Sequence, residues 1–273
     1  MTHSGADIAH LLSAHGLRPS RALGQNFVAD PNTVRRMARL AGVGPGSRVL
    51  ELGAGLGSLT LALAETGARV VAVETDRHVV PVLRSVVEPV GVEVVEGDAM
   101  TLDLAGLLEA RGGGTWDLVA NLPYNVATPL VLRVLEGVPA VARLLVMVQR
   151  EVGERLAAGP GEPAYGAVSV RIAYFARARV VGRVPATVFV PRPKVESVLV
   201  AMERLAAPAV DPSVVSYERL ASVVRAGFGQ RRKMLRRSLA GVVDPAAFDR
   251  AGVRPDARAE ELGVQEWGRL AAP

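Results

Sequence analysis

Four groups of residues that can bind or activate a ligand lie at the ends of four short apolar segments. They are a glycine-rich loop, two acids and an amide: Gly53-Ala54-Gly55-Leu56-Gly57, Glu74, Asp98 and Asn121. In an open parallel sheet, ligands bind outside the carboxyl ends of the strands. If the four segments are parallel strands, the four groups meet at one edge. Their common position is then stronger evidence for a site than any group alone.

The first three groups predict a ligand that contains an adenosyl moiety. A loop without Cβ atoms at Gly53, Gly55 and Gly57 lets a ligand approach the backbone closely. Its G-x-G-x-G spacing departs from the dinucleotide pattern G-x-G-x-x-G, and no Lys-Ser or Lys-Thr follows, as it would in a triphosphate loop. Glu74 is placed to accept both hydroxyls of a ribose. Asp98 is placed to accept a hydrogen bond from an adenine amine, or else to cap a helix. These residues leave NAD and S-adenosylmethionine as alternatives.

The fourth group, Asn121-Leu122-Pro123-Tyr124, favours methylation of an aromatic amine. The exocyclic N6 of adenine is a poor nucleophile because its lone pair is delocalised into the ring. The Asn121 side-chain oxygen and the Leu122 carbonyl can each accept one N6 hydrogen, which favours a lone pair localised toward a sulfonium methyl. Pro123 fixes the turn, and Tyr124 offers a face on which the base can stack. We therefore expect S-adenosylmethionine as the cofactor.

Alternating strand and helix patterns predict the scaffold that positions these groups. The expected strands are nearly continuously apolar, as in a parallel sheet covered on both faces, and span 48–52, 69–74, 92–96, 116–120 and 143–148. Helices are expected over 58–66 and 77–87, and two further strands over 180–202, around Pro191-Arg192-Pro193. Residues 1–46 have a helical pattern, with a helix start at Asp30-Pro31-Asn32.

The length of 273 residues fits one large and one small domain. The pattern becomes wholly helical after residue 205, so we expect an α/β catalytic domain over 1–205, with its helical lead-in 1–46, and a helical domain over 206–273. The net charge of +5 is concentrated in one stretch of the second domain, and the other 26 basic and 27 acidic residues nearly cancel. This stretch predicts an anionic partner, with a solvated helix face as the alternative. Its basic residues are Arg225, Arg231, Arg232, Lys233, Arg236 and Arg237.

Composition also excludes or disfavours several classes of site and location. Without cysteine there are no disulfides, thiolate metal sites or cysteine nucleophile. The four histidines are scattered without the spacing of metal ligands, so we expect no metal. No apolar run approaches the ~18 residues that span a bilayer, and the N-terminus lacks a signal pattern. We therefore expect a cytoplasmic protein with no membrane partner.

Six motifs, in order along residues 22–265, resemble those of the KsgA (RsmA) family of ribosomal RNA adenine N6,N6-dimethyltransferases. The motifs are Leu23-Gly24-Gln25-Asn26-Phe27-Val28, Asn121-Leu122-Pro123-Tyr124-Asn125, Gln149-Arg150-Glu151-Val152, Ala164-Tyr165-Gly166, Phe189-Val190-Pro191-Arg192-Pro193-Lys194-Val195-Glu196-Ser197 and Phe228-Gly229-Gln230-Arg231-Arg232-Lys233-Met234-Leu235-Arg236-Arg237-Ser238-Leu239. One departure is Ala54, where the family usually has Pro. We expect it to change the stiffness of the loop rather than the ligand.

The resemblance implies a Rossmann-like class I S-adenosylmethionine-dependent methyltransferase sheet with a small C-terminal helical domain. The implied cofactor contacts are Gln25, Asn26, Val28, Gly53, Gly55, Glu74, Thr75, Asp98, Ala99 and Asn121. The implied catalytic residues are Asn121, Leu122, Pro123, Tyr124 and Phe189, with Phe189 stacking on the base opposite Tyr124. The implied substrate is two adjacent adenosines in the 3′-terminal hairpin of 16S rRNA, in the assembling 30S subunit. The six basic residues would then hold RNA phosphates, and we expect a monomer.

Three other functions stay open from the sequence. An Erm-type 23S rRNA adenine methyltransferase, which confers antibiotic resistance, shares the fold and catalytic logic, but Asn125 and the Gln230-Arg231-Arg232-Lys233 motif favour the KsgA type. An NAD-dependent oxidoreductase is disfavoured by the glycine spacing and by the Asn121 motif. A non-catalytic ribosome assembly factor is the third.

Overall fold

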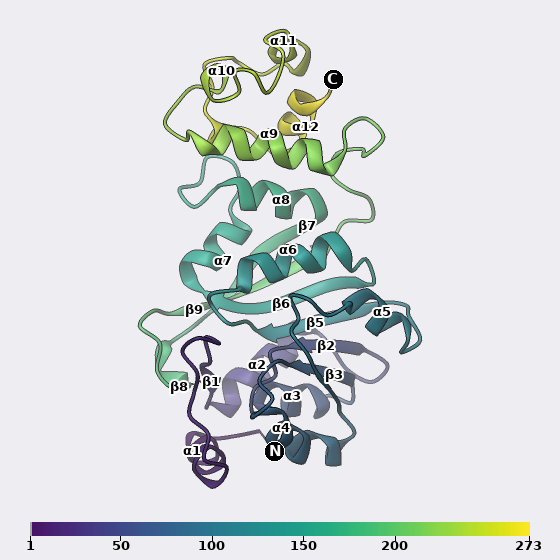
Figure 1. Cartoon of the computed structure of the whole chain (residues 1–273), viewed down its shortest axis with the longest axis vertical. Coiled ribbons are helices and arrows are strands. Elements are labelled where there is room, and N and C mark those ends of the chain that lie inside the picture. Colours follow the sequence, from purple (N-terminus) through teal and green to yellow (C-terminus); the bar gives the residue numbers. More distant parts are fainter. Residues whose placement is uncertain (1) are drawn as a thin grey trace. The chain divides into compact units, whose positions relative to one another are not determined.

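The computed structural model describes residues 2–273, and the chain divides into two compact units (Figure 1). The first unit extends from the N-terminus to Gly153 and resumes over Val180–Glu203. The second unit comprises Glu154–Arg179 and Arg204–Pro273. The boundary at Arg204 lies close to the domain boundary expected near residue 205. The second unit also includes residues 154–179, which were expected to belong to the first domain.

The first unit is built on a seven-stranded sheet in the order β4-β3-β2-β5-β6-β9-β7. Its parallel part consists of β2 (Arg48–Leu52), β3 (Arg69–Glu74), β4 (Glu93–Glu96), β5 (Trp116–Asn121) and β6 (Val141–Gln149). β9 (Ser197–Arg204) pairs antiparallel with β6, and β7 (Ala176–Val184) is the last strand. The alternating apolar runs therefore form the mostly parallel α/β sheet that the sequence predicts.

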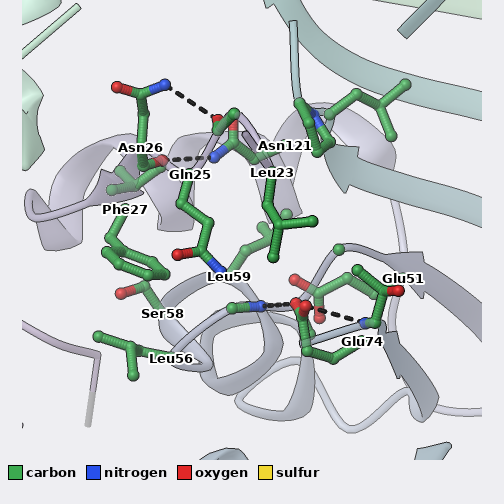
Figure 2. A pocket seen from close by; sticks show the side chains of 18 of the residues that line it. Leu23, Gln25, Asn26, Phe27, Glu51, Leu56, Ser58, Leu59, Glu74 and Asn121 are labelled. Atoms are coloured by element: carbon green, nitrogen blue, oxygen red, sulfur yellow. Dashed lines mark hydrogen bonds between the residues drawn. The ribbon is translucent and has the colours of Figure 1, made fainter. Parts of the chain in front are cut away.

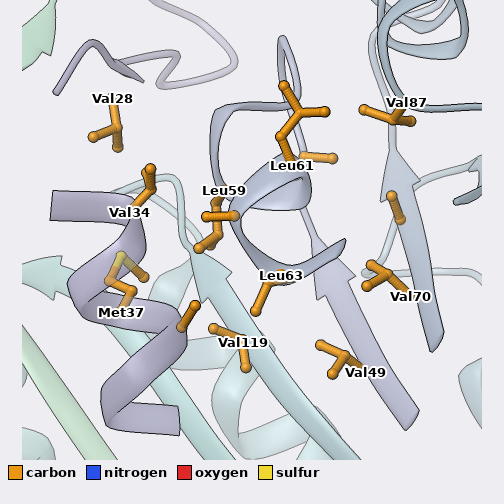
Figure 3. Packing of buried hydrophobic residues seen from close by; sticks show 14 of the residues in the cluster. Val28, Val34, Met37, Val49, Leu59, Leu61, Leu63, Val70, Val87 and Val119 are labelled. Atoms are coloured by element: carbon orange, nitrogen blue, oxygen red, sulfur yellow. The ribbon is translucent and has the colours of Figure 1, made fainter. Parts of the chain in front are cut away.

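Helices α2 (Pro31–Ala41), α3 (Ser58–Ala64) and α4 (Val80–Val87) share one core with the sheet (Figure 3). Met37 from α2 and Leu63 from α3 are fully buried in this core beside Val119 of β5. The remaining helical segments of this part of the chain are α5 (Leu104–Glu109), α6 (Ala127–Gly137) and the short 3₁₀ turns η1 (Glu88–Val90) and η2 (Ala186–Val188). Helices bury the nearly continuous apolar strands of this sheet. This packing holds in place the edge of the sheet at which the site lies.

The expected start of α2 is confirmed in detail. The Asp30 side chain accepts hydrogen bonds from the backbone N–H groups of Asn32 and Thr33, and Pro31 occupies the first turn, where no N–H is needed. The helix ends at Gly42, whose φ of 64° lies in the left-handed region that favours glycine. Capping at both ends thus sets the helix bounds locally.

The helical lead-in expected over residues 1–46 is wrong in part. Helix α1 (Gly5–Ala14) is followed by a short strand, β1 (Phe27–Val28), which pairs antiparallel with β8 (Phe189–Val190). A two-residue strand has no periodicity to detect, and its partner lies about 160 residues away in the sequence. This small sheet joins the N-terminal segment to residues 189–190 of the same unit.

The second unit is a helical assembly with its own core. It contains α8 (Ala167–Phe175), α9 (Tyr217–Gly229), α10 (Leu235–Ser238), α11 (Ala247–Ala251), η3 (Ala259–Glu261) and α12 (Val264–Ala271), while α7 (Arg150–Ala157) and strand β7 each cross a unit boundary. Tyr165, in the segment 154–179, is buried in this core with Trp267, and its hydroxyl donates to the Leu262 carbonyl at 2.7 Å. Those contacts explain why the segment belongs with the C-terminal helices. Within the described residues, no helix has the length and apolar character needed to cross a membrane.

Candidate active site

Two adjoining hollows lie at the carboxyl ends of the parallel strands, and Figure 2 shows the first of them. Both are lined by Leu23, Gly53, Thr75 and Pro123, so they form neighbouring parts of one site. The first brings together most of the predicted cofactor residues: Gln25, Asn26, Val28, Gly53, Gly55, Glu74, Thr75 and Asn121. The second contains the other two, Asp98 and Ala99. Four predicted catalytic residues, Asn121, Leu122, Pro123 and Tyr124, line the first hollow.

The glycine loop and Glu74 are locked together. Glu74 Oε2 accepts a hydrogen bond from the Gly55 N–H at 2.7 Å, and Oε1 accepts from the N–H groups of Thr75 and Asp76, each at 2.9 Å. Gly55 has a φ of 57°, and a Cβ there would lie 3.0 Å from the ring of Phe27. Glycine is therefore required both by the backbone and by the space at this point of the loop.

Burial raises the pKa of the Glu74 carboxyl, and its three backbone N–H donors act in the opposite direction. The side chain is only 5% exposed, yet it lines the hollow. Oε2 uses one lone pair on Gly55 and keeps another for a donor. One hydroxyl, such as one of the two on a ribose, fits this acceptor.

Asn121 ends β5 with its side-chain amide in a defined orientation. Its Nδ2 donates to the Asn26 carbonyl at 3.1 Å (Figure 2). A backbone carbonyl can only accept, so the nitrogen must face Asn26 and the amide oxygen faces elsewhere. The arrangement leaves Oδ1 as an acceptor for a ligand N–H.

Tyr124 is held at the same turn by its hydroxyl, which lies 2.8 Å from Ser197 Oγ of β9. Burial raises the pKa of Tyr124, so the ring stays neutral. The Leu122 N–H donates to the Met147 carbonyl at 3.1 Å, which fixes the exit of the chain from β5. The motif is thus a rigid edge of the hollow rather than a free loop.

An N-terminal strap, which we define as residues 20–28, forms the facing wall. Asn125 Nδ2 donates to the Ala22 carbonyl at 3.3 Å, and Gln25 Nε2 donates to Asp76 Oδ2 at 2.8 Å. The strap approaches Asn125 closely at Gly24, because a Cβ at position 24 would lie 2.9 Å from Asn125 Oδ1. The strap is therefore docked directly on the predicted catalytic motif.

Phe189 is not part of the hollow, contrary to its predicted stacking role. It is 3% exposed and packs in the core cluster that contains Val28, its backbone partner in the β1–β8 pair. Alternation along a strand directs this side chain inward, which the sequence motif alone does not reveal. In this structure Phe189 is a core aromatic residue.

Asp98 does not cap a helix, contrary to the alternative expected for it, because it begins a turn and the N-cap of α5 is Asp103. Asp98 Oδ1 accepts from the Met100 N–H at 2.8 Å, and its backbone carbonyl accepts from the Thr101 N–H at 2.9 Å. It nevertheless lines the second hollow beside Ala99 and Met100. The carboxylate has a second oxygen available for a ligand amine.

The six basic residues of the second unit are all exposed, but they do not form one helix. Arg225 lies on α9, Arg231, Arg232 and Lys233 lie in the turn that follows, and Arg236 and Arg237 lie on α10. Arg231 is paired with Glu260 at 3.0 Å. The six residues are therefore distributed over two helices and a turn.

Sequence reasoning missed Glu51, a buried acid of β2 that lines the first hollow. Burial raises its pKa to about 8, with a further rise from the charge of Glu74 and an opposing effect of the Thr60 hydroxyl. An acid inside the apolar run 49–52, two residues before the glycine loop, was the available signal. Among residues 2–273, no cluster of three or more His, Asp or Glu side chains could hold a metal ion.

The comparisons with known proteins agree on one family. A family model described as "Ribosomal RNA adenine dimethylase" matches residues 17–272. "Ribosomal RNA small subunit methyltransferase A" of Leifsonia xyli subsp. xyli is 47% identical over 98% of this chain and 96% of its own length. The protein of that name from Bifidobacterium adolescentis is 44% identical over 97% and 92%.

Solved structures show the same fold. The 23S rRNA methyltransferase ErmE has a TM-score of 0.70 and 26% identity, covering 90% of this chain and 98% of its own. A dimethyladenosine transferase from Plasmodium falciparum has a TM-score of 0.74 and 21% identity, covering 88% and 94%. The chain therefore has the class I methyltransferase fold over nearly its whole length.

Proposed function

This chain belongs to the ribosomal RNA adenine dimethylase family, and on that premise we propose that it dimethylates N6 of two adjacent adenosines in the 3′-terminal hairpin of 16S rRNA. The curated relatives that are 44% and 47% identical are small-subunit enzymes, whereas the 23S enzyme is 26% identical. This difference favours the small-subunit substrate over the 23S alternative. The glycine spacing and the family membership remove the NAD-dependent oxidoreductase.

The first hollow fits S-adenosylmethionine by the chemistry of its walls. Gly53 and Gly55 line this hollow, where Glu74 Oε2 has a lone pair for a ribose hydroxyl, and Asp98 in the adjoining hollow has an oxygen for the adenine amine. When bound, the cofactor supplies an electrophilic methyl group on a sulfonium. We infer that Gln25, Asn26 and Val28 of the strap close over the cofactor from the opposite wall.

The observation that carries the catalytic assignment is the fixed amide of Asn121. With Nδ2 on the Asn26 carbonyl, Oδ1 can accept one N6 hydrogen of adenine, and the Leu122 carbonyl can accept the other. These bonds pyramidalise the nitrogen and direct its lone pair at the methyl group. Because the leaving thioether is neutral, alignment matters more than a strong base, and the N6 proton passes to water after transfer.

The target base must leave its stack to reach this edge, as in other base-modifying enzymes. Tyr124 then offers its ring as a stacking face, while its hydroxyl stays bonded to Ser197. We infer that the six exposed basic residues of the second unit hold phosphates and set the register of the RNA. We further propose that the protein acts as a metal-free cytoplasmic monomer on the assembling 30S subunit.

Methyl transfer to immature 30S subunits, followed by mapping of the modified adenosines, tests this function. The wild-type chain should dimethylate two adjacent adenosines near the 3′ end of 16S rRNA. Asn121→Ala should reduce transfer at least about 100-fold, because it removes an acceptor that acts only as N6 reacts. Its affinity for S-adenosylmethionine, measured by calorimetry, should be partly retained.

Three results would contradict parts of this scheme. Modification of 23S rRNA in place of 16S rRNA would identify an Erm-type enzyme. Binding to 30S subunits without any transfer would identify a non-catalytic assembly factor. Full transfer by Asn121→Ala would show that another group accepts the N6 hydrogens.

A further inference from the structure

Helix α1 lines neither hollow, yet it packs against two residues that line the first one. Its Ile8 is fully buried in a cluster with Phe27 of the strap and Leu56 of the glycine loop. Phe27 and Leu56 both line the first hollow (Figure 2). The family model matches residues 17–272, so α1 precedes every residue of that match. Helix α1 therefore supports two walls of the first hollow without reaching a ligand inside it.

Both ends of α1 are defined by local sequence signals. The Ser4 side chain accepts from the Asp7 N–H at 3.3 Å, and the Asp7 carboxylate accepts from the Ser4 N–H at 2.8 Å, which completes a capping box. At the other end Gly16 has a φ of 62°, and the Leu17 N–H donates to the Leu12 carbonyl at 2.8 Å, as in a Schellman motif. Leu12 and Leu17 also pack against the cluster described above. The sequence thus specifies the helix locally, and packing of its apolar side decides where it docks.

A hydrogen bond joins the N-terminal segment directly to the glycine loop. His3 Nε2 lies 3.0 Å from the Leu56 carbonyl oxygen, and it donates because a carbonyl can only accept. The loop needs support from outside, since Gly53, Gly55 and Gly57 all have positive φ and glycine loses the most conformational freedom when it is ordered. The bond from His3 therefore restricts a loop that would otherwise sample many conformations.

We propose that residues 3–17 form an N-terminal clamp, which positions the glycine loop and the strap for S-adenosylmethionine and slows its release. His3 and Ile8 are then positioning residues, because they act through Leu56 and Phe27 and contact no ligand. The choice of cofactor rests on the proposed function, whereas the clamp itself rests on these contacts. Walls that are ordered before the ligand arrives reduce the entropic cost of binding.

The expected size of the effect depends on the fraction of molecules in which both walls are in place. The apparent dissociation constant equals the intrinsic constant divided by that fraction, so walls in place only about a tenth of the time raise it tenfold. Bound cofactor favours the docked clamp by mass action. At saturating cofactor, turnover should therefore stay close to that of the wild type.

Ile8→Ala tests the packing, since alanine removes most of the buried side chain and is the best helix former. The dissociation constant for S-adenosylmethionine, measured by calorimetry on the full chain, should rise about tenfold. In methyl transfer to immature 30S subunits, KM for the cofactor should rise by the same factor while kcat stays within about twofold. Ile8→Leu should restore the affinity, because it conserves the side-chain volume. His10→Ala, at an exposed position of α1, serves as the matched control and should change neither constant.

His3→Ala tests the bond to the Leu56 carbonyl. It should raise the dissociation constant for S-adenosylmethionine several-fold, and His3→Gln should raise it less, because the glutamine N–H can donate in place of the imidazole. Wild-type affinity in His3→Ala would remove His3 from the clamp.

Hydrogen exchange of the wild-type chain tests the clamp without any substitution. Coupling is reciprocal, so if docking of the clamp favours the cofactor, the cofactor must favour docking by the same factor. Saturating S-adenosylmethionine should therefore slow exchange of the backbone amides of residues 9–14 about tenfold, although α1 lines neither hollow. Where circular dichroism shows that Ile8→Ala does not fold, this measurement decides.

The clamp and the proposed function can fail separately. Wild-type affinity in Ile8→Ala, or unchanged exchange of residues 9–14 with cofactor bound, would refute the clamp and leave methyl transfer by the wild type intact. Loss of kcat at unchanged KM would also refute it, because α1 would then support turnover and not cofactor binding. Failure of S-adenosylmethionine to bind the wild-type chain would refute the proposed function and the clamp with it.

Discussion

Replacing Glu51 by Gln is expected to stabilise the first unit at pH 8 and to flatten the decline of its stability between pH 5 and pH 8. The pKa of the Glu51 carboxyl rises from 4.5 to about 8 on burial. Between these two values the unfolded chain is ionised at this position and the folded chain is protonated. The folded state then binds more protons, so the free energy of unfolding decreases as the pH rises through this window.

The size of the effect follows from the difference between the two pKa values. Each pKa unit corresponds to about 1.4 kcal/mol, so the full window from 4.5 to about 8 is worth on the order of 5 kcal/mol. That is a large share of the roughly 5–15 kcal/mol by which a domain is stable. Gln has the same shape and no charge, so Glu51→Gln removes the pH dependence without opening a cavity.

Urea unfolding at half-unit steps from pH 5 to pH 8.5 measures this difference. Trp116 is fully buried in the first unit and Trp267 in the second. A Trp267→Phe background shared by both proteins therefore makes fluorescence report the first unit alone. Glu109→Gln serves as the control for loss of an exposed acid. Stability curves that run parallel with and without the Glu51→Gln substitution would refute a protonated Glu51 in the fold.

Three other substitutions test separate parts of the structure. Asn125→Asp removes the donor to the Ala22 carbonyl and should weaken S-adenosylmethionine binding several-fold in calorimetry; unchanged binding would show that the strap does not depend on this bond. Phe189→Leu should lower the free energy of unfolding in urea by about 1–2 kcal/mol with little change in kcat, whereas lost kcat at unchanged stability would restore a stacking role. Arg236→Ala with Arg237→Ala should reduce the slope of log K against log salt for RNA binding by about 1.5, and an unchanged slope would remove these residues from the interface.

Strand bounds were predictable wherever one sequence feature marked each end. β2 and β3 begin and end where the sequence analysis places them, because apolar runs stop at Gly53 and at Glu74. Helix α4 begins at Val80 rather than at residue 77, since Asp76 first forms a turn in which its Oδ1 accepts from the His78 N–H. Such side-chain turns compete with the first turn of a helix.

The features that the sequence did not reveal depend on contacts between distant segments. The β1–β8 pair joins two residues near the N-terminus to two residues about 160 positions later. In the stretch 225–239, α9 ends at Gly229, and the chain turns before α10 begins at Leu235. The strand pair and the turn between α9 and α10 both depend on tertiary packing, which can override local sequence preference.

The residue types of the candidate site were predictable because ligand binding requires particular functional groups. Their burial and their hydrogen-bond partners were not predictable. Glu74 could be placed at a strand end from the sequence, whereas its three N–H donors depend on how the loop folds back. Glu51 differs from an ordinary surface acid only in its burial, which the fold decides. Phe189 differs in the opposite way, because it belongs to a functional motif in the sequence but is buried in the hydrophobic core of the structure.

The orientation of the Asn121 amide depends on the least extensive element of the first unit. Asn121 lies at the end of a central strand, yet its amide is fixed by the Asn26 carbonyl of the strap, 95 residues earlier. The strap is held by a two-residue strand pair and a few side-chain bonds, so its docking has far less support than the sheet. A cofactor that contacts Gln25 and Asn26 would stabilise the docked strap by mass action. Under the proposed function, binding of the methyl donor would also orient the Asn121 oxygen toward the target amine.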